Sequence, residues 1–384
     1  MGKQIGIEKG LYYRQTLFDQ ARRIVIKVGS AILTGEDGMN LLFVENLARG
    51  IAFLQDSGRE VILVTSGAVS AGRRKINNTH ENLTIKEKQA LAAIGQSCLM
   101  NHYDIAFHGC GRNIGQILLT HSDLSSRKRY LNVRNTILTL FKFNVIPVIN
   151  ENDTVSTEEL KFGDNDNLAA LVANLIEADM FICLTDVDGL YERDPHLYPE
   201  AKPIYTVSEV TKEIEAMAGN SKSALGAGGM QSKIRAAKMV SAGGGCSLIG
   251  PGRRKNILQH LFSGELAGTF FLPKKEKMRG RKRWIAYVLK PKGTLVLDAG
   301  ACRAVSQNNK SLLPTGIIDV EGEFSTGDAV VCMNSNHEKV AVGLTNFSSE
   351  ELFKIKGLRS DKIEQVLGHK EADEVLHRDN LVVI

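Results

Sequence analysis

A run of polar residues, Gly163-Asp164-Asn165-Asp166-Asn167, immediately precedes a segment whose apolar residues repeat at helical spacing. A single Asp or Asn is enough to cap the first turn of a helix, so this run exceeds the needs of capping. Its carboxylates and amides are suited to binding an ammonium group, or to holding lysines and magnesium in place. The run therefore predicts a polar binding site at the start of a helix.

Two lysines lie beside glycine-rich turns. Lys27 precedes Gly29-Ser30 at the end of an apolar run, and Lys233 ends the run Gly226-Ala227-Gly228-Gly229-Met230-Gln231-Ser232-Lys233. Glycines let backbone N–H groups approach an anion, and a lysine ammonium neutralises phosphate oxygens. Taken alone, Lys27 is better explained as a strand-end lysine that extends to solvent. The glycine-rich run fits neither the Walker pattern nor the dinucleotide-binding pattern.

Three further polar turns follow predicted strands. They are Thr65-Ser66-Gly67-Ala68-Val69-Ser70-Ala71-Gly72, Asn150-Glu151-Asn152-Asp153 and Thr185-Asp186-Val187-Asp188-Gly189-Leu190-Tyr191. The first also fits a tight turn that needs glycine, and the third also fits an acidic β-turn. Together, the two lysines, the glycine-rich turns and the acidic cluster favour phosphoryl transfer, which needs charge neutralisation and positioning.

Short apolar strands alternate with helical stretches through the first half of the chain. The expected strands are residues 23–28, 61–64, 114–119, 145–149 and 180–184, and the expected helices cover 44–54, 85–107, a stretch ending near 143, and 168–176. Such alternation predicts a mostly parallel sheet covered by helices on both faces. Ligands of such sheets bind beyond the carboxyl ends of the strands, where the polar turns lie.

The composition changes after about residue 272. Residues 274–283 hold seven basic residues and one acidic residue, and short strand-like pieces follow at 284–289, 294–297, 317–320, 329–333 and 339–344. We therefore expect an N-terminal extension (1–22), a catalytic domain (23–272), a basic linker (273–283), a small β-rich domain (284–360) and a charged tail (361–384).

The composition fits an enzyme of ordinary globular character. The chain of 384 residues is 43% hydrophobic and 24% charged, with a net charge of +5 that identifies no partner. Its six cysteines are scattered, without the spacing of a zinc site or a disulfide framework, which indicates a reducing compartment. We find no signal peptide and no apolar run long enough to span a membrane, and we expect a cytoplasmic protein.

These motifs resemble those of the glutamate 5-kinases in the amino acid kinase family. The resemblance covers residues 23–272 and rests on Ile26-Lys27-Val28-Gly29-Ser30, Val64-Thr65-Ser66-Gly67-Ala68, Val148-Ile149-Asn150-Glu151-Asn152-Asp153, the run 163–167, Leu184-Thr185-Asp186 and Gly228-Gly229-Met230-x-x-Lys233. It implies a three-layer αβα sandwich. Residues 294–305 and 312–331 resemble a PUA domain, a small β-rich fold.

The resemblance implies ATP-dependent phosphorylation of the side-chain carboxylate of L-glutamate, the first step of proline biosynthesis. Lys27 and Lys233 would stabilise the transferring γ-phosphoryl group, and Asp166 would orient both ammonium groups. The implied glutamate-binding residues are Ser66, Gly67, Asn150, Asp153, Asp164 and Asn165. The implied ATP-binding residues are Lys27, Gly29, Ser30, Thr185, Asp186, Ala227, Gly228, Gly229, Met230, Gln231, Ser232 and Lys233. Mg²⁺ would bridge the ATP phosphates with few protein ligands.

Further expectations follow from the same resemblance. The enzyme would be inhibited by proline through the loop between Asp153 and Asp164, would form a homodimer or homotetramer, and would work with glutamyl phosphate reductase. Two positions depart from the family's pattern: Ser30 replaces a common threonine and keeps its hydroxyl, and Ala227 replaces another threonine, which removes a contact to the nucleotide.

Two alternatives remain open at the level of sequence. Another amino acid kinase, acting on aspartate, acetylglutamate, carbamate or a nucleoside monophosphate, would share the fold and the phosphate chemistry. An RNA-binding role through the PUA-like domain and the basic run 274–283 is the other alternative. Against it, Trp284 is the only tryptophan of the chain, and no aromatic stacking platform is evident.

Overall fold

The computed structural model describes residues 7–35, 38–77, 82–156, 164–195, 197–218, 229–308 and 310–384. The chain divides into two compact units, Met1–Lys277 and Met278–Ile384. Three residues to which the sequence assigned a role, Gly163, Ala227 and Gly228, lie outside the described residues.

An eight-stranded sheet forms the centre of the first unit, in the order β10-β12-β11-β7-β1-β4-β6-β5. Its strands are β1 (Arg23–Val28), β4 (Glu60–Val64), β5 (Asn113–Leu119), β6 (Val145–Glu151), β7 (Met180–Thr185), β10 (Thr206–Val207), β11 (Cys246–Pro251) and β12 (Thr269–Phe271). The six strands from β11 to β5 are parallel, and β12 runs antiparallel to β11. Their carboxyl ends therefore meet at one edge, as the alternation predicted.

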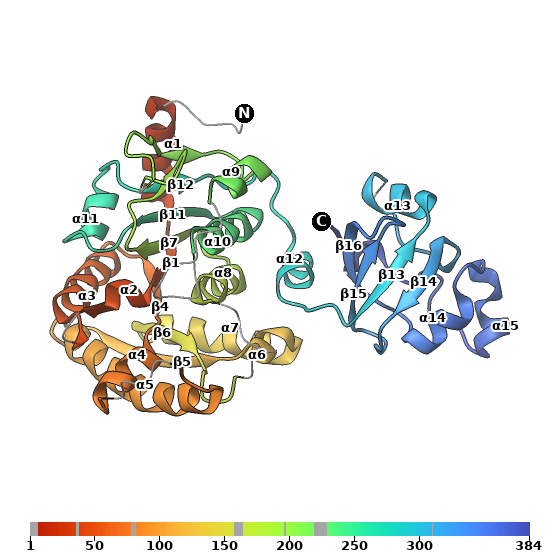
Figure 1. The fold of residues 1–384 in the computed structure, drawn as a ribbon, viewed down its shortest axis with the longest axis horizontal. Coiled ribbons are helices and arrows are strands. Elements are labelled where there is room, and N and C mark those ends of the chain that lie inside the picture. The colour runs from red at the N-terminus through yellow and green to blue at the C-terminus, as the bar shows by residue number, and fades with distance from the viewer. Residues whose placement is uncertain are drawn as a thin grey trace. The chain divides into compact units, whose positions relative to one another are not determined.

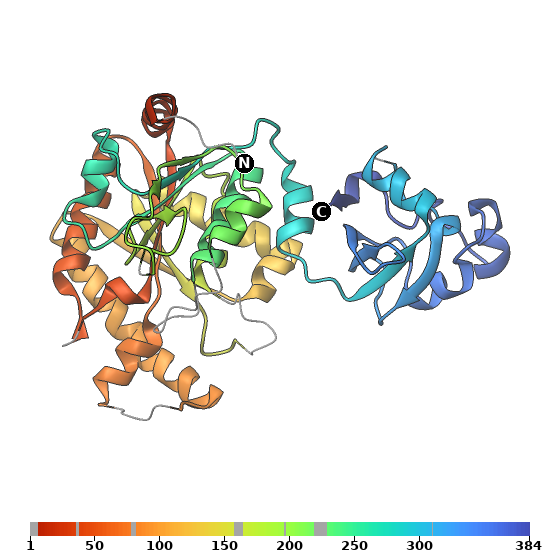
Figure 2. The ribbon, with the colours of Figure 1, turned by 45° about the horizontal axis from the view of Figure 1, so that its top comes forward.

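Helices cover both faces of this sheet (Figures 1 and 2). One face packs against α1 (Ile7–Gln20), α3 (Leu41–Asp56), α5 (Ile85–His108) and α11 (Ile257–Phe262), and the other against α7 (Arg127–Lys142), α8 (Asn165–Leu175) and α10 (Met230–Ala242). Shorter elements connect them: α2 (Ser30–Leu33), β2 (Thr34–Gly35), β3 (Gly38–Met39), α4 (Ala68–Lys75), α6 (His121–Ser125), β8 (Leu190–Tyr191), β9 (Pro203–Ile204) and α9 (Lys212–Met217). This is the expected three-layer αβα sandwich.

Local sequence explains where the helices α5 and α8 begin. Thr84 and Glu87 form a capping box at the start of α5, in which each side chain bonds the other residue's backbone N–H. The Asp164 side chain accepts from the backbone N–H of Asn167 and caps α8. One residue of the polar run at 163–167 therefore does cap the helix, and the next two side chains remain for other contacts.

Helices α4 and α5 touch at two glycines. A Cβ atom added at Gly95 would lie 1.8 Å from the carbonyl oxygen of Ala68, and one added at Gly72 would lie 1.9 Å from that of Leu91. Real Cβ atoms do not come so close to backbone, so both glycines are required by the contact. The contact fixes the position of α5 against the start of α4.

We expect Gly95→Ala to lower the free energy of unfolding of the first unit by about 1–3 kcal/mol, because the added methyl group forces α4 and α5 apart. Urea unfolding followed by circular dichroism measures the loss. Ser97→Ala, on the exposed side of the same helix, is the matched control. Equal stability of the two variants would show that α4 and α5 separate at little cost.

The second unit contains a five-stranded sheet in the order β14-β13-β15-β16-β17. Its elements are α12 (Gly280–Tyr287), β13 (Gly293–Leu297), α13 (Ala299–Ser306), β14 (Ile317–Glu321), β15 (Ala329–Met333), β16 (Lys339–Leu344), α14 (Ser349–Ile355), α15 (Ile363–Leu367) and β17 (Leu381–Val383), with 3₁₀ turns at Pro314–Gly316, Ser360–Lys362 and Arg378–Asn380. The pair β13–β15 is parallel and the other neighbours are antiparallel. This is the expected small β-rich domain.

The structure differs from the expectation at the chain's beginning. The segment 1–22 was taken as an extension, yet α1 packs on the first unit through Phe18, which is fully buried. Arg14 is also buried and donates from its guanidinium to the carbonyl oxygen of Ala267 at 2.7 Å. Hydrophobic patterning gave little signal here, because the buried positions of α1 are Gly10, Arg14 and Phe18, and only Phe18 carries a large apolar side chain.

Two expectations for the second unit were wrong. Residues 284–289 were taken as a strand beside a basic linker, whereas α12 spans Gly280–Tyr287 and buries Arg283 and Ile285. A six-residue apolar run cannot distinguish a strand from a short buried helix. Residues 361–384 were taken as a tail, but β17 pairs with β16, and Val375 and Leu376 enter the core. These buried pieces are too short to show a period.

Among the described residues, none of the helices combines the length and the hydropathy that crossing a bilayer requires.

Candidate active site

Asp166, the second residue of α8, lies at the centre of the candidate site and is fully buried. Its Oδ1 atom lies 2.5 Å from Nζ of Lys27, and its Oδ2 atom lies 3.3 Å from Nζ of Lys233. The Ser232 hydroxyl donates to Oδ2 at 2.7 Å, and the Cys183 thiol donates to Oδ1 at 3.5 Å. One carboxylate thus holds an ammonium group from β1 and another from α10.

The charges of this cluster stabilise one another. Burial alone would raise the pKa of Asp166, but the charges of Lys27 and Lys233 outweigh it and hold that pKa well below its usual range. Burial disfavours the ammonium form of Lys27, yet the Asp166 carboxylate raises its pKa above the usual value. Burial, with the Asp166 charge, raises the pKa of Cys183 to about 12, so it remains a thiol. At neutral pH the cluster therefore holds an ionised carboxylate and a charged Lys27.

Asn165 gathers a second polar cluster next to Asp166. Its Nδ2 atom lies 2.6 Å from the carbonyl oxygen of Thr65, 2.9 Å from Oγ of Ser66 and 2.9 Å from Oδ1 of Asn150. These partners stand at the ends of β4 and β6. Consecutive residues of one helix start therefore organise two groups of side chains that the sequence separates widely.

Glycines stand at two backbone turns of the site, at the starts of α4 and α2. Gly67 begins α4 with φ of 94°, the left-handed region that glycine adopts freely. At Gly29, before α2, a Cβ atom would lie 3.8 Å from Nζ of Lys27. The ammonium group of Lys27 therefore lies over the turn that ends β1.

The start of α10 lies in the same cluster. Gly229 is its N-cap, and Met230, Gln231, Ser232 and Lys233 form the first turn. Lys233 is buried, whereas Gln231 is exposed. A helix of 13 residues directs unpaired N–H groups and a partial positive charge toward whatever binds at this end.

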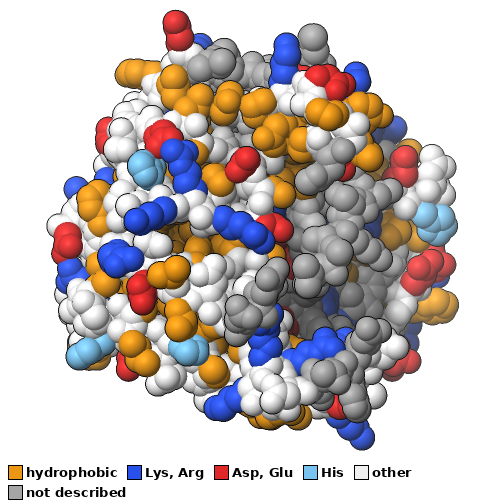
Figure 3. Space-filling model, turned by 60° about the vertical axis from the view of Figure 1, so that its left-hand side comes forward, with side chains coloured by type: hydrophobic (Ala, Val, Ile, Leu, Met, Phe, Trp, Pro, Cys, Tyr) orange, Lys and Arg blue, Asp and Glu red, His pale blue; other side chains and the backbone are white. Residues whose placement is uncertain are grey.

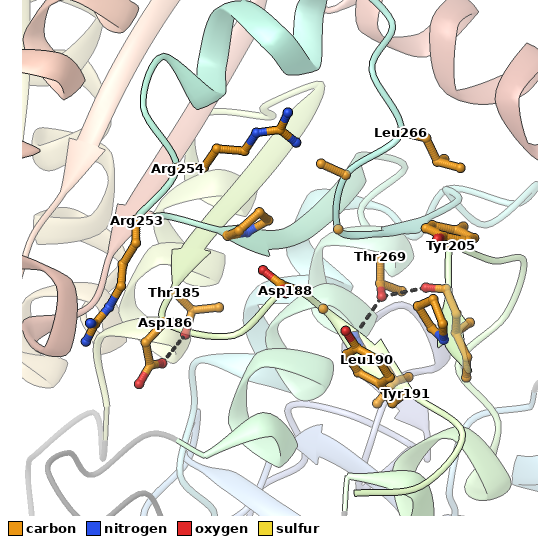
Figure 4. Close-up of a pocket in the computed structure, with 16 residues that line it drawn as sticks. Thr185, Asp186, Asp188, Leu190, Tyr191, Tyr205, Arg253, Arg254, Leu266 and Thr269 are labelled. Carbon is orange, nitrogen blue, oxygen red and sulfur yellow. Dashed lines mark hydrogen bonds between the residues drawn. The ribbon is translucent and has the colours of Figure 1, made fainter. Parts of the chain in front are cut away.

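Two cavities, of about 570 and 720 Å³, open in this unit and share Asp186, Arg253 and Arg254 in their walls. Thr185 lines the first, where its hydroxyl donates to the Asp186 carboxylate at 3.0 Å (Figure 4), and Ser30 lines the second. Ser30, Thr185 and Asp186, which the sequence suggested as ATP-binding residues, therefore line these cavities. Lysine and arginine side chains also gather on the face shown in Figure 3.

The sequence also assigned two acidic residues, Asp153 and Asp164, to glutamate binding, and Asp164 adjoins the Asp166 cluster through a hydrogen bond with Ser232. Asp153 lies half-buried in the turn after β6. Asp164 caps α8, and burial together with the Asp166 charge raises its pKa.

The sequence reasoning missed several residues of the site. Cys183 contacts Asp166 from the middle of β7, and its place inside an apolar strand gave no signal. Arg253 and Arg254 follow β11, where the Arg253 guanidinium donates to the carbonyl oxygen of Ala31 at 3.4 Å. Three cations in a row directly after a strand, Arg253-Arg254-Lys255, were a signal that could have found them.

The donor set limits how a metal ion could be held. Among the described residues, no group of three or more His, Cys, Asp or Glu side chains is arranged to bind one. The oxygens of Asp166 are engaged by the lysines and Ser232. Asp164 and Asp186 each offer one carboxylate, which fits a divalent ion held through one or two carboxylates and the phosphates of a substrate.

Comparison with known proteins agrees with this geometry. Residues 22–249 match the model of the amino acid kinase family, and residues 293–367 match that of the PUA domain. The chain is 60% identical to a glutamate 5-kinase of Desulfotalea psychrophila over 97% of its own length and 99% of that protein. It is 47% identical to a glutamate 5-kinase of Syntrophus aciditrophicus, over 97% and 96%. The chain therefore belongs to the amino acid kinase family, within its glutamate 5-kinases, and carries a PUA domain.

Proposed function

We infer that this chain is a glutamate 5-kinase, which transfers the γ-phosphoryl group of ATP to the side-chain carboxylate of L-glutamate. One observation carries the chemistry: the buried Asp166 carboxylate holds two lysine ammonium groups at one edge of the sheet. The choice of glutamate as acceptor rests on the relatives, which match over nearly the whole chain. The product, glutamyl 5-phosphate, enters proline biosynthesis.

In the proposed mechanism, the two lysines neutralise the charge that develops on the transferring group. A carboxylate oxygen of glutamate attacks the γ-phosphorus, and the bond to the β–γ bridging oxygen breaks as ADP leaves. Lys27 contacts the phosphoryl oxygens from the β1 side and Lys233 from the α10 side. Asp166 fixes both ammonium groups, so little reorganisation is needed when charge develops.

The remaining site residues divide between the two substrates. We assign glutamate to the groups around Asn165: Ser66, Gly67, Asn150, Asp153 and Asp164. We assign ATP to Gly29, Ser30, Thr185, Asp186 and the α10 start, where N–H groups face the phosphates; Ala227 and Gly228 belong to this proposal but lie outside the described residues. Mg²⁺ carried by the phosphates, with Asp164 or Asp186 as a carboxylate ligand, would neutralise phosphate charge.

Glutamate-dependent formation of ADP by the purified full-length chain tests the function. We expect activity with L-glutamate and Mg²⁺–ATP, and at most trace activity with aspartate, acetylglutamate or carbamate. Greater turnover of another acceptor would reject the assignment while leaving the family unchanged.

Asn165→Ala should raise KM for glutamate about 10-fold or more and leave KM for ATP nearly unchanged, because the amide holds Ser66 and Asn150 in place. Steady-state kinetics with each substrate varied in turn measures both constants. Asn132→Ala, on the exposed side of α7, is the control. A rise in KM for ATP of equal size would contradict the division of the site.

We also propose feedback inhibition by proline at the glutamate pocket, a homodimer or homotetramer, and glutamyl phosphate reductase as the enzyme that consumes the product. Most of the proposed inhibitor loop, residues 157–163, lies outside the described residues. Competitive inhibition by millimolar proline supports the first point, and its absence removes it. The six free cysteines suit a reducing cytoplasm.

A further inference from the structure

Gln96 in α5 carries a buried hydrogen-bond donor that no described residue satisfies. Its Nε2 atom is buried and has no partner in the part of the chain that the structure describes. Its Oε1 atom accepts from Nδ2 of Asn150 at 2.8 Å. A buried donor without a partner is costly, and native proteins rarely leave one unless a ligand or a water completes it.

Backbone groups fix the orientation of this amide. The backbone N–H of Glu151 can only donate, and it bonds Oδ1 of Asn150 at 2.9 Å. Nδ2 of Asn150 must therefore face Gln96, so Gln96 must present its oxygen there. The Thr65 carbonyl oxygen, which can only accept, fixes the Asn165 amide in the same way. An amide flip cannot remove the unpaired donor, because it would oppose two N–H₂ groups.

The position of Gln96 on its helix directs it to the acceptor side of the site. Gln96, Leu99, Tyr103 and Phe107 follow one another at spacings of helical neighbours, and the last three are buried. Tyr103 reaches the end of β4, where its hydroxyl lies 2.8 Å from Oγ1 of Thr65. The close contact of the adjacent Gly95 with α4 fixes the position of this face of α5.

We propose that Nε2 of Gln96 donates a hydrogen bond to a carboxylate oxygen of the amino-acid acceptor and thereby favours acidic acceptors. The donor can pair only with an acceptor atom, so it suits a carboxylate and disfavours an ammonium group. Gln96 thus adds a residue that contacts substrate to the hydrogen-bonded series Ser66, Asn165 and Asn150. The inference rests on the proposed function, because it requires an amino-acid acceptor at this cluster.

The substitution Gln96→Glu tests the donor of this side chain apart from its acceptor. The introduced carboxyl group keeps an oxygen for Nδ2 of Asn150, but it replaces the donor with a second oxygen. At pH 8 we expect KM for glutamate to rise about 10–100-fold, the range typical of losing a hydrogen bond to a charged group. KM for ATP should stay within about twofold, because the ATP-binding candidates lie elsewhere.

The pH dependence distinguishes a lost donor from a disturbed fold. The introduced carboxyl group would be buried beside the carboxylate of the acceptor, and both effects raise its pKa above the usual value of about 4.3. As the pH falls toward 5, it therefore gains a proton and can donate again. The ratio of variant to wild-type KM for glutamate should therefore fall with pH. A structural defect would leave this ratio constant and would also lower the melting temperature of the ligand-free chain.

Ser97→Ala, one residue along on the exposed side of α5, serves as the control and should retain the wild-type KM. If the wild type phosphorylates glutamate and Gln96→Glu keeps the wild-type KM at pH 8, the inference is wrong and the donor binds water. An inactive wild type would instead reject the proposed function. A KM ratio that does not change with pH would also overturn the inference.

Discussion

Lys233→Ala is expected to lower kcat by about 10²–10³-fold, the usual effect of removing one donor that stabilises charge in a transition state. The physical reason is the position of its ammonium group, which is buried and lies 3.3 Å from Asp166 at the start of α10. There it can neutralise charge on the transferring phosphoryl group. Measuring kcat for ADP formation at saturating glutamate and ATP gives the effect.

A second lysine of α10 provides the control. Lys238 is paired with Glu215 at 2.6 Å, and its side chain is 44% exposed. Lys238→Ala should therefore retain the wild-type kcat, since a surface ion pair contributes little. A Lys233→Ala variant that retained more than half of the wild-type kcat would remove this residue from the proposed mechanism.

Asp166→Asn is expected to lower the free energy of unfolding of the first unit by about 3–5 kcal/mol at pH 7, because it leaves two buried ammonium groups without their carboxylate. Lys27 and Lys233 are 5% and 6% exposed, so solvent cannot take its place. Activity should fall as well, since both lysines lose their shared anchor. Urea unfolding of the full chain, monitored by a spectroscopic signal that reports on the first unit, measures the free energy of unfolding.

A surface pair on the same unit shows how much burial matters. Asp56 pairs with Arg112, and its side chain is 65% exposed. Asp56→Asn should cost less than about 1 kcal/mol. If the two variants lost similar stability, the Asp166 cluster would contribute no more than a surface contact.

The same cluster predicts how stability depends on pH. The folded-state pKa of Asp166 lies well below the value of about 3.9 for an unfolded chain. Its contribution is therefore complete above about pH 4 and declines as the pH falls through that value toward the folded pKa. The difference in free energy of unfolding between wild type and Asp166→Asn should shrink only below about pH 4.

Much of the first unit could be predicted from sequence because its signals are local. The strands β1, β4, β6 and β7 are largely apolar runs, and each of them ends in a polar or glycine-containing turn. Parallel strands place such turns at one edge, so Lys27, Asp166 and Lys233 were expected near one another before any distance was known.

Short or isolated contacts were harder to predict. The helix α1 joins the first unit mainly through Phe18 and Arg14, and β17 joins the second through three residues. The buried positions of α1 include only one large apolar side chain, and β17 has only three residues, so neither showed a hydrophobic period and the sequence assigned them to an extension and a tail. Gln96 gave no signal for another reason: it lies inside a helix and not after a strand, and it continues the buried face of α5.

The sequence alone determined the class of chemistry, because glycines, lysines and carboxylates after strands favour phosphate transfer, and motif resemblance added glutamate. Only the tertiary structure decided how these groups pair. Asp166 contacts Lys27 and Lys233. Its neighbour Asp164 caps the helix, whereas Asn165 donates to Asn150. Successive residues at a helix start point in different directions, and which partner each one meets depends on strands brought together only by folding.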